Sequence, residues 1–207
     1  MLLIDDSRSI GSRGNAQAII NGYMKFIESL RKAPGQVLIK TMFLNNIVNL
    51  PFQAPGTVAP LSQNYRLTSG TPLFRRSVQA LNCILAEAKC LSETGRTVRT
   101  ITFIVTDGGD STSGPVSSSD VRKFTDMMFR SGKHIVGACA VNDGVTDFMK
   151  VFSEMGIPER WIMVLKNDPS DIEGTLCGMG KMTSHASAGP ASFGETSISG
   201  FSGISGT

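Results

Sequence analysis

The stretch VRTITFIV, at residues 98–105, decides the fold class of this chain. It is rich in β-branched residues, which is typical of a strand that is covered on both of its faces. Residues 134–141, HIVGACAV, have the same character. Strands of this kind belong to parallel sheets that carry helices on each side.

Helical patterns alternate with these strands along the chain. Residues 15–32 place apolar side chains at helical spacing, and Pro34 and Gly35 end the pattern. Pro72 suits the first turn of a helix that runs to about Leu91. Further helices are predicted at residues 119–131, 146–155 and 169–178. The alternation predicts an α/β, doubly wound, mostly parallel, Rossmann-like sheet of about six strands, with helices on both faces.

One strand of this sheet is expected to be antiparallel. Residues 36–44 and 47–52 both have strand character, and the Asn45-Asn46 pair between them favours a turn. The two segments therefore predict a hairpin, and so one antiparallel strand at an edge. The remaining strands are predicted at residues 1–4, 98–105, 134–141 and 161–165.

The composition and charge of the chain argue against several functional classes. The 207 residues carry a net charge of only +3, with scattered Lys and Arg, which does not favour nucleic-acid binding. Four cysteines without C-x-x-C spacing and two histidines do not indicate a zinc site. No apolar run is long enough to span a membrane. Because the oxygen-rich loop begins at Asp5, we expect no signal peptide and a cytoplasmic protein.

The composition changes near the C-terminus. We expect one domain at residues 1–180 and a Ser/Gly-rich tail at residues 181–207. The tail repeats an apolar-Ser-Gly unit, at Ile198, Phe201 and Ile204. A flexible tail is the favoured interpretation. The alternative is an extended segment whose apolar side chains fit a partner's groove, including tail-mediated self-association.

Small oxygen-bearing side chains follow the predicted strands. Asp5, Ser7 and Ser9 come directly after the first strand, spaced two apart, so that an extended chain would place all three on one side. Thr71 begins the predicted helix, and Asp107 follows the strand at residues 98–105. Parallel strands bring their carboxyl ends to one edge of the sheet. Two carboxylates and three hydroxyls there would suit Mg²⁺, with Mn²⁺ as second candidate and Ca²⁺ disfavoured by the low oxygen count.

The stretches LLIDDSRS, SGTPLF and FIVTDGGD resemble the three motifs of the von Willebrand factor type A (vWA) domain. Those motifs form the metal-ion-dependent adhesion site (MIDAS) of that family. The resemblance extends over about residues 1–180 and is greatest to compact bacterial or phage-type members. It implies one Mg²⁺ held by Asp5, Ser7, Ser9, Thr71 and Asp107. It also implies a non-catalytic module in which an Asp or Glu of a partner protein completes the coordination.

Arg8 departs from this pattern, because many relatives have glycine at that position. A guanidinium near the ion would oppose it electrostatically, whereas one directed outward could bind a partner's carboxylate in bidentate fashion. Arg66, Arg75 and Arg76 lie near Thr71 in the sequence and could form a basic rim, although a solvated surface is the favoured interpretation. We retain Arg8 and Arg75 as candidate partner-binding residues.

Two other functions stay open. The first is a metal-dependent phosphatase or phosphotransferase with Asp5 as nucleophile. Phosphatases that use a D-x-D loop take their proton donor from the second Asp, and Ser7 stands at that position here. The second is a purely structural module with an empty site, an alternative that Arg8 keeps open.

Overall fold

Five parallel strands form one sheet in the computed structural model, which describes residues 1–188, 200 and 201. The strands are β1 (Leu2–Ile4), β2 (Thr41–Phe43), β3 (Thr100–Thr106), β4 (His134–Val141) and β5 (Ile162–Leu165). Their order across the sheet is β2-β1-β3-β4-β5, and each neighbouring pair is parallel. The predicted α/β class, with a parallel central sheet, is confirmed.

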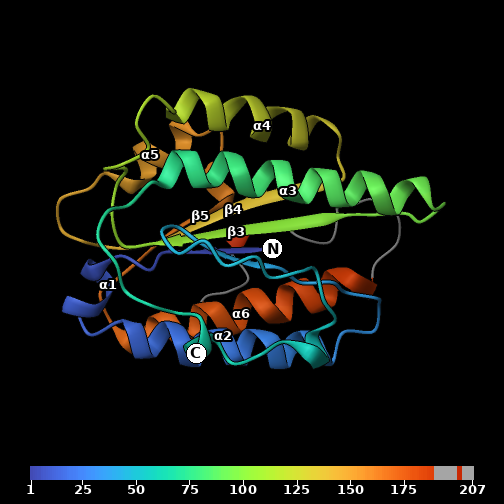
Figure 1. The fold of residues 1–207 in the computed structure, drawn as a ribbon, viewed down its shortest axis with the longest axis horizontal. Coiled ribbons are helices and arrows are strands. Elements are labelled where there is room, and N and C mark those ends of the chain that lie inside the picture. The colour runs from blue at the N-terminus through green and yellow to red at the C-terminus, as the bar shows by residue number, and fades with distance from the viewer. Residues whose placement is uncertain (189–199, 202–207) are drawn as a thin grey trace.

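Helices cover both faces of this sheet. They are α1 (Arg8–Ser12), α2 (Ala16–Arg31), α3 (Leu73–Glu93), α4 (Ser118–Arg130), α5 (Phe148–Glu154) and α6 (Pro169–Ala188). Figure 1 shows α3, α4 and α5 on one side of the sheet, α2 and α6 on the other, and α1 at the end where the strands finish. Short 3₁₀ turns lie at Pro55–Thr57, Leu61–Gln63 and Glu159–Trp161.

The strands are continuous apolar runs in the sequence because their residues are buried. All seven residues of β3 are buried, and so are the three of β1. β1 lies between β2 and β3, with Ile4 in register with Val105. The residues that follow β1 and β3 therefore leave the sheet side by side, near its middle.

The expected hairpin after residue 36 is wrong. β2 is short and pairs in parallel with β1, and the segment at residues 47–52 forms no strand. One isolated antiparallel bridge, between Ile39 and Gln53, is what remains of the predicted pairing. Two features oppose a second strand. Pro51 has no N–H to donate, and the Asn45 and Asn46 N–H groups donate to the Asp6 carboxylate at 2.8 and 3.0 Å. The sheet accordingly has five strands rather than about six, with no antiparallel edge strand among the described residues.

The last helix is longer than the sequence predicts. The expected helix at residues 169–178 continues to Ala188 and packs along α2. Of the tail predicted at residues 181–207, positions 189–199 and 202–207 lie outside the described residues. Phe201 is described and is buried. No helix within the described part of the chain combines the length and apolarity that a membrane span requires.

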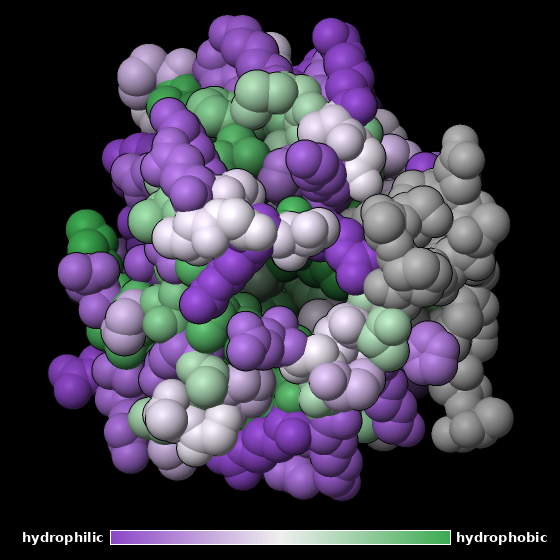
Figure 2. All heavy atoms as spheres, turned by 90° about the vertical axis from the view of Figure 1, so that its right-hand side faces the viewer, coloured by the Kyte–Doolittle hydropathy of each residue, from purple (hydrophilic) through white to green (hydrophobic). Residues whose placement is uncertain are grey.

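A cavity of about 1110 Å³ opens at the amino-terminal end of the sheet. Its lining includes Phe26 from α2, Leu91 from α3 and Phe103 from β3. Figure 2 faces this end of the molecule and shows a hollow with apolar residues inside it. The cavity lies at the opposite end of the strands from Asp5 and Asp107, which follow the carboxyl ends of β1 and β3.

Candidate functional site

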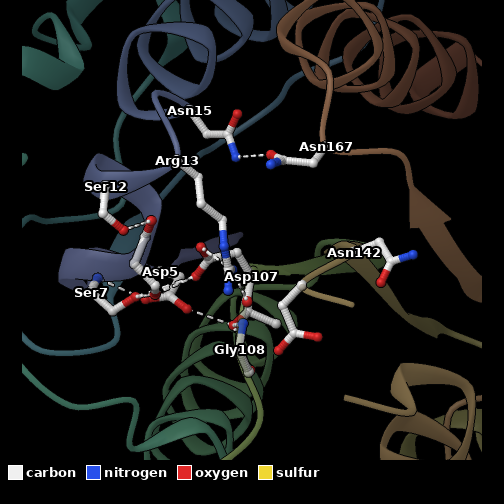
Figure 3. Close-up of polar contacts among 12 residues, drawn as sticks. Asp5, Ser7, Ser12, Arg13, Asn15, Asp107, Gly108, Asn142 and Asn167 are labelled. Atoms are coloured by element: carbon white, nitrogen blue, oxygen red, sulfur yellow. Dashed lines mark hydrogen bonds and ion pairs between the residues drawn. The ribbon is translucent and has the colours of Figure 1, made fainter. Parts of the chain in front are cut away.

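The register of β1 and β3 brings Asp5 and Asp107 together. The Asp5 N–H donates to the Val105 carbonyl at 2.8 Å, which extends the ladder by one residue beyond β1. The Ser9 hydroxyl donates to Asp107 Oδ1 at 2.7 Å, and the Ser7 hydroxyl lies 3.4 Å from the same oxygen. Ser7 Oγ and Ser9 Oγ are 2.7 Å apart. The side chains of Ser7, Ser9 and Asp107 thus form one contiguous polar cluster, and the Asp5 carboxylate adjoins it through the Ser7 N–H (Figure 3).

The Asp5 side chain is held in a fixed position. Its Oδ1 accepts the Ser7 N–H at 2.8 Å, and its Oδ2 accepts the Thr106 hydroxyl at 2.5 Å. The buried Tyr65 hydroxyl donates to the Asp5 carbonyl at 2.8 Å. These contacts turn the chain sharply after β1, because the main chain two residues on is tied to the Asp5 carboxylate.

Ser7 and Ser9 lie close together, but the backbone conformation that brings them together differs from the expected one. The sequence predicts an extended stretch with side chains alternating in period two. Instead Ser7 occupies the N-cap of α1, and Ser9 lies in the first turn of that helix. Ser7 pairs with Thr68 in an isolated parallel bridge, and the Arg8 N–H donates to the Thr68 carbonyl at 2.8 Å. Only three residues separate β1 from α1, and the start of the helix sets the distance between the two hydroxyls.

Thr71, the fifth expected residue, is buried next to the turn that carries Asp107. A Cβ added to Gly108 would lie 3.7 Å from Thr71 Oγ1, so the hydroxyl faces that glycine. The Thr71 N–H donates to Ser111 Oγ at 2.9 Å, and the Ser111 N–H returns to the Thr71 carbonyl at 2.9 Å. This reciprocal pair joins the segment before α3 to the loop after β3.

Arg13 is the residue of this cluster that sequence reasoning missed. Its Nη1 donates to the carbonyl oxygen and to Oδ2 of Asp107, both at 2.9 Å. The Arg13 side chain is 29% exposed, whereas that of Asp107 is fully buried. Figure 3 shows Arg13 reaching from the end of α1 toward Asp107. The available signal was helical spacing, since Arg13 stands four residues after Ser9 and its N–H bonds to the Ser9 carbonyl at 3.1 Å.

Burial opposes the charged form of both acids. It raises the pKa of Asp5 to about 6, against the hydrogen bonds from Thr106 and Ser7, and the neighbouring Asp107 adds a small upward effect. Burial also raises the pKa of Asp107, against Ser9 and the Arg13 guanidinium. A carboxylate in this environment is favoured when a cation lies close to it. The Arg13 guanidinium supplies such a cation to one of the two acids, Asp107.

Two further acids near this edge have structural tasks. Besides the Asn45 and Asn46 N–H groups, the Asp6 carboxylate accepts both asparagine side-chain amides. Asp110 accepts the Phe74 N–H at 3.1 Å in the first turn of α3, together with the Ser113 hydroxyl. Asp6 therefore anchors the loop after β2, and Asp110 anchors the start of α3.

The two candidate partner-binding arginines, Arg8 and Arg75, lie on the surface. The Arg8 side chain is exposed, and so is that of Arg75 in the first turn of α3. Arg66 is also exposed. Arg76 is half-buried and its Nε donates to the Phe43 carbonyl at 2.9 Å. Arg8, which the sequence suggested as a competitor for the ion, thus lies on the surface, and Arg13 occupies the position next to the acid.

The side chains of the expected site provide the type of ligand atom that a hard cation prefers. Asp5, Asp107, Ser7, Ser9 and Thr71 offer only oxygen atoms, and the two acids are buried beside hydroxyls. Within the described residues no group of three or more His, Cys, Asp or Glu side chains is placed so that it could hold a metal ion. The expected centre is of another type, because three of its five ligands are hydroxyls. No protein-family model matches this chain, and no curated protein matches it either.

Proposed function

We propose that this chain is a non-catalytic protein-binding module of the vWA type. In this proposal Asp5, Ser7, Ser9, Thr71 and Asp107 hold one Mg²⁺, which recruits an Asp or Glu side chain of a partner protein. The observation that carries the proposal is the meeting of Ser9 and Asp107 at 2.7 Å, beside Asp5, from segments about 100 residues apart.

The fixed geometry around Asp5 supports metal binding. Thr106 and the Ser7 N–H orient its carboxylate, so that the metal would meet a pre-positioned ligand. Mg²⁺ favours oxygen ligands and retains open positions for water or an incoming carboxylate. The exposed Arg8 would then lie where a partner's acid approaches, and Arg75 lies at the start of α3. When bound, the ion would supply positive charge to a site that otherwise contains two buried acids.

Arg13 and the metal would compete for Asp107. The guanidinium engages Oδ2, the oxygen that the Ser9 hydroxyl leaves open. This ion pair is also the observation that favours a second candidate, a structural module in which Arg13 replaces the metal. The two candidates differ in one measurable property, which is whether divalent cations stabilise the folded chain.

A phosphatase that uses Asp5 has less support. Such an enzyme needs a proton donor near its nucleophile. Ser7 stands at the expected position, and the nearby Asp6 carboxylate is engaged by Asn45 and Asn46. We therefore expect no turnover of generic phosphate esters with Mg²⁺ or Mn²⁺.

Metal titration tests the proposal directly. We expect Mg²⁺ and Mn²⁺ to raise the melting temperature of the chain and EDTA to reverse the rise, with Ca²⁺ weaker. Asp107→Asn should remove the effect, whereas Asp126→Asn, on α4 away from this edge, should retain it. A pull-down with and without EDTA would then identify partners that depend on the ion. Equal melting temperatures in EDTA and in millimolar Mg²⁺ would refute metal binding and leave the structural module.

A further inference from the structure

Phe201, far along the chain from the sheet, is seated against the face that α2 and α6 cover. Its ring centroid lies 5.9 Å from that of Phe103 on β3 and 5.8 Å from that of Trp161, at 77° to the Trp161 ring. Phe103 in turn meets Phe26 of α2 edge-on, which identifies the face. Phe201 is only 4% exposed. The aromatic contacts and the burial define a seat for one large apolar side chain.

Glycine on β4 makes room for this seat. Gly137 is paired in register with Phe103, and a Cβ at Gly137 would lie 3.0 Å from Phe201 Cζ. A side chain at this strand position would enter the space that the Phe201 ring fills. The seat is therefore built into the sheet and does not depend on the metal-site residues.

The position before Phe201 also requires a particular residue, which is glycine. Gly200 has φ of +107°, a backbone conformation that L side chains rarely adopt. A Cβ at Gly200 would lie 2.3 Å from the Arg160 carbonyl oxygen. The protein thus accommodates a pair of residues, a glycine followed by a large apolar residue.

The tail contains this pair more than once. Gly200-Phe201 is followed by Gly203-Ile204, and Ile198 begins a further apolar-Ser-Gly unit. Phe103 also lines the cavity of about 1110 Å³ at the end of the sheet, so apolar space adjoins the seat. The sequence therefore offers more units of this kind than the one that the described seat holds.

We propose that the seat formed by Phe103, Gly137 and Trp161 is a binding site for the glycine-apolar unit of this tail, and that the tail of a second copy can occupy it. Eleven residues, 189–199, connect Ala188 to Gly200. A chain of that length can extend to about 40 Å, which is enough to reach a neighbouring molecule. Exchange of an identical element between copies needs no new complementary surface.

The sole tryptophan of the chain, Trp161, reports on occupancy. The experiment uses full-length Phe201→Ala and a synthetic peptide of residues 196–207, TSISGFSGISGT, which contains neither Trp nor Tyr. We expect a saturable change in Trp161 emission as the peptide is added. Replacing Phe with Ala in the peptide should weaken binding about tenfold or more, because the buried ring supplies most of the apolar contact. Alanine at the Gly200 position should also weaken it, whereas alanine at Gly206 is the matched control.

Mixing two full-length variants tests exchange between copies. Phe201→Ala removes the ring that fills the seat, and Gly137→Val places a side chain in the seat while leaving the tail intact. At high protein concentration the mixture should form a dimer, by sedimentation, that neither variant forms alone to the same extent. EDTA should not affect the dimer, which separates this result from any failure of metal binding.

Two outcomes would overturn the proposal. The binding site is overturned if the peptide shows no saturable binding, or if the Phe and Gly replacements in the peptide do not weaken its binding. The peptide titration does not depend on whether Gly137→Val folds. Absence of the mixed dimer with folded variants overturns the exchange between copies.

Discussion

Arg13 donates to both the carbonyl and the carboxylate of Asp107, so one guanidinium holds the turn that leaves β3. The pair links the end of α1 to the loop after β3, two segments that also supply the proposed metal ligands. Because the Asp107 side chain is fully buried, its charge depends on a nearby cation. Either Arg13 or a bound metal ion can supply that cation.

Arg13→Gln should therefore lower the stability of the metal-free chain and raise its affinity for Mg²⁺. Without metal, removal of the guanidinium leaves Asp107 buried and unpaired, and we expect a loss of about 2–3 kcal/mol in the free energy of unfolding. Mg²⁺ affinity should rise several-fold, since the competing cation is gone. Urea unfolding in EDTA and calorimetric Mg²⁺ titration measure the two effects, with Arg13→Lys as a charge-retaining control. Unchanged Mg²⁺ affinity in Arg13→Gln would show that the arginine does not compete.

Asp5→Asn should remove metal and partner binding without unfolding the chain. Asparagine keeps an oxygen that can accept the Ser7 N–H and removes a buried charge whose pKa is raised to about 6. In EDTA at pH 7 the variant should thus be as stable as the wild type, or more stable by about 1–3 kcal/mol. Thermal melts with and without Mg²⁺ provide the measurement. If the variant still shows a Mg²⁺-dependent rise in melting temperature, Asp5 is not a ligand.

The meeting of Asp5 and Asp107 could be predicted from sequence for a topological reason. Parallel strands that are adjacent in a sheet deliver the residues after them to the same edge, so two apolar runs that each end in aspartate suffice. The contact of Arg13 could not be predicted in this way. It depends on α1 beginning at Arg8, and the alternating polar pattern of Asp5, Ser7 and Ser9 favours an extended chain instead.

The errors in the fold have similar long-range causes. The Asn45-Asn46 pair favours a hairpin locally, but the Asp6 carboxylate, from a distant segment, accepts both main-chain N–H groups. Gly178 and Gly180 weaken the helical pattern after residue 178, yet α6 continues to Ala188 because it packs on α2. In each case a tertiary contact outweighs local propensity.

Gly180 should be required for that packing. A Cβ at Gly180 would lie 2.8 Å from the Phe26 Cα and carbonyl oxygen, so any larger residue would push α6 away from α2. We expect Gly180→Ala to destabilise the fold by about 1–3 kcal/mol. Gly174→Ala is the matched control on the same helix, because no atom lies within 4 Å of its added Cβ, and it should stabilise by about 0.5–1 kcal/mol. Denaturant midpoints compare the two, and equal effects would contradict a close helix crossing.

His134 should make the folded chain less stable as the pH falls. Burial, with a smaller effect from Lys133, lowers the pKa of this first residue of β4 below its ordinary value of 6.5, and its Nδ1 lies 2.8 Å from the Thr100 hydroxyl. Between the lowered pKa and 6.5 the unfolded chain binds more protons at this position than the folded chain does. The contribution of His134 is thus fully present above pH 6.5 and is lost as the pH falls below it.

His134→Gln, which keeps a hydrogen-bonding group beside Thr100, removes the titration. Urea unfolding of the wild type and the variant from pH 7.5 to 5.5 isolates the effect, because contributions from other groups such as Asp5 cancel in the difference. We expect the wild type to lose stability relative to the variant as the pH decreases. A difference that stays constant across this range would mean that His134 takes up protons equally in the folded and unfolded chains.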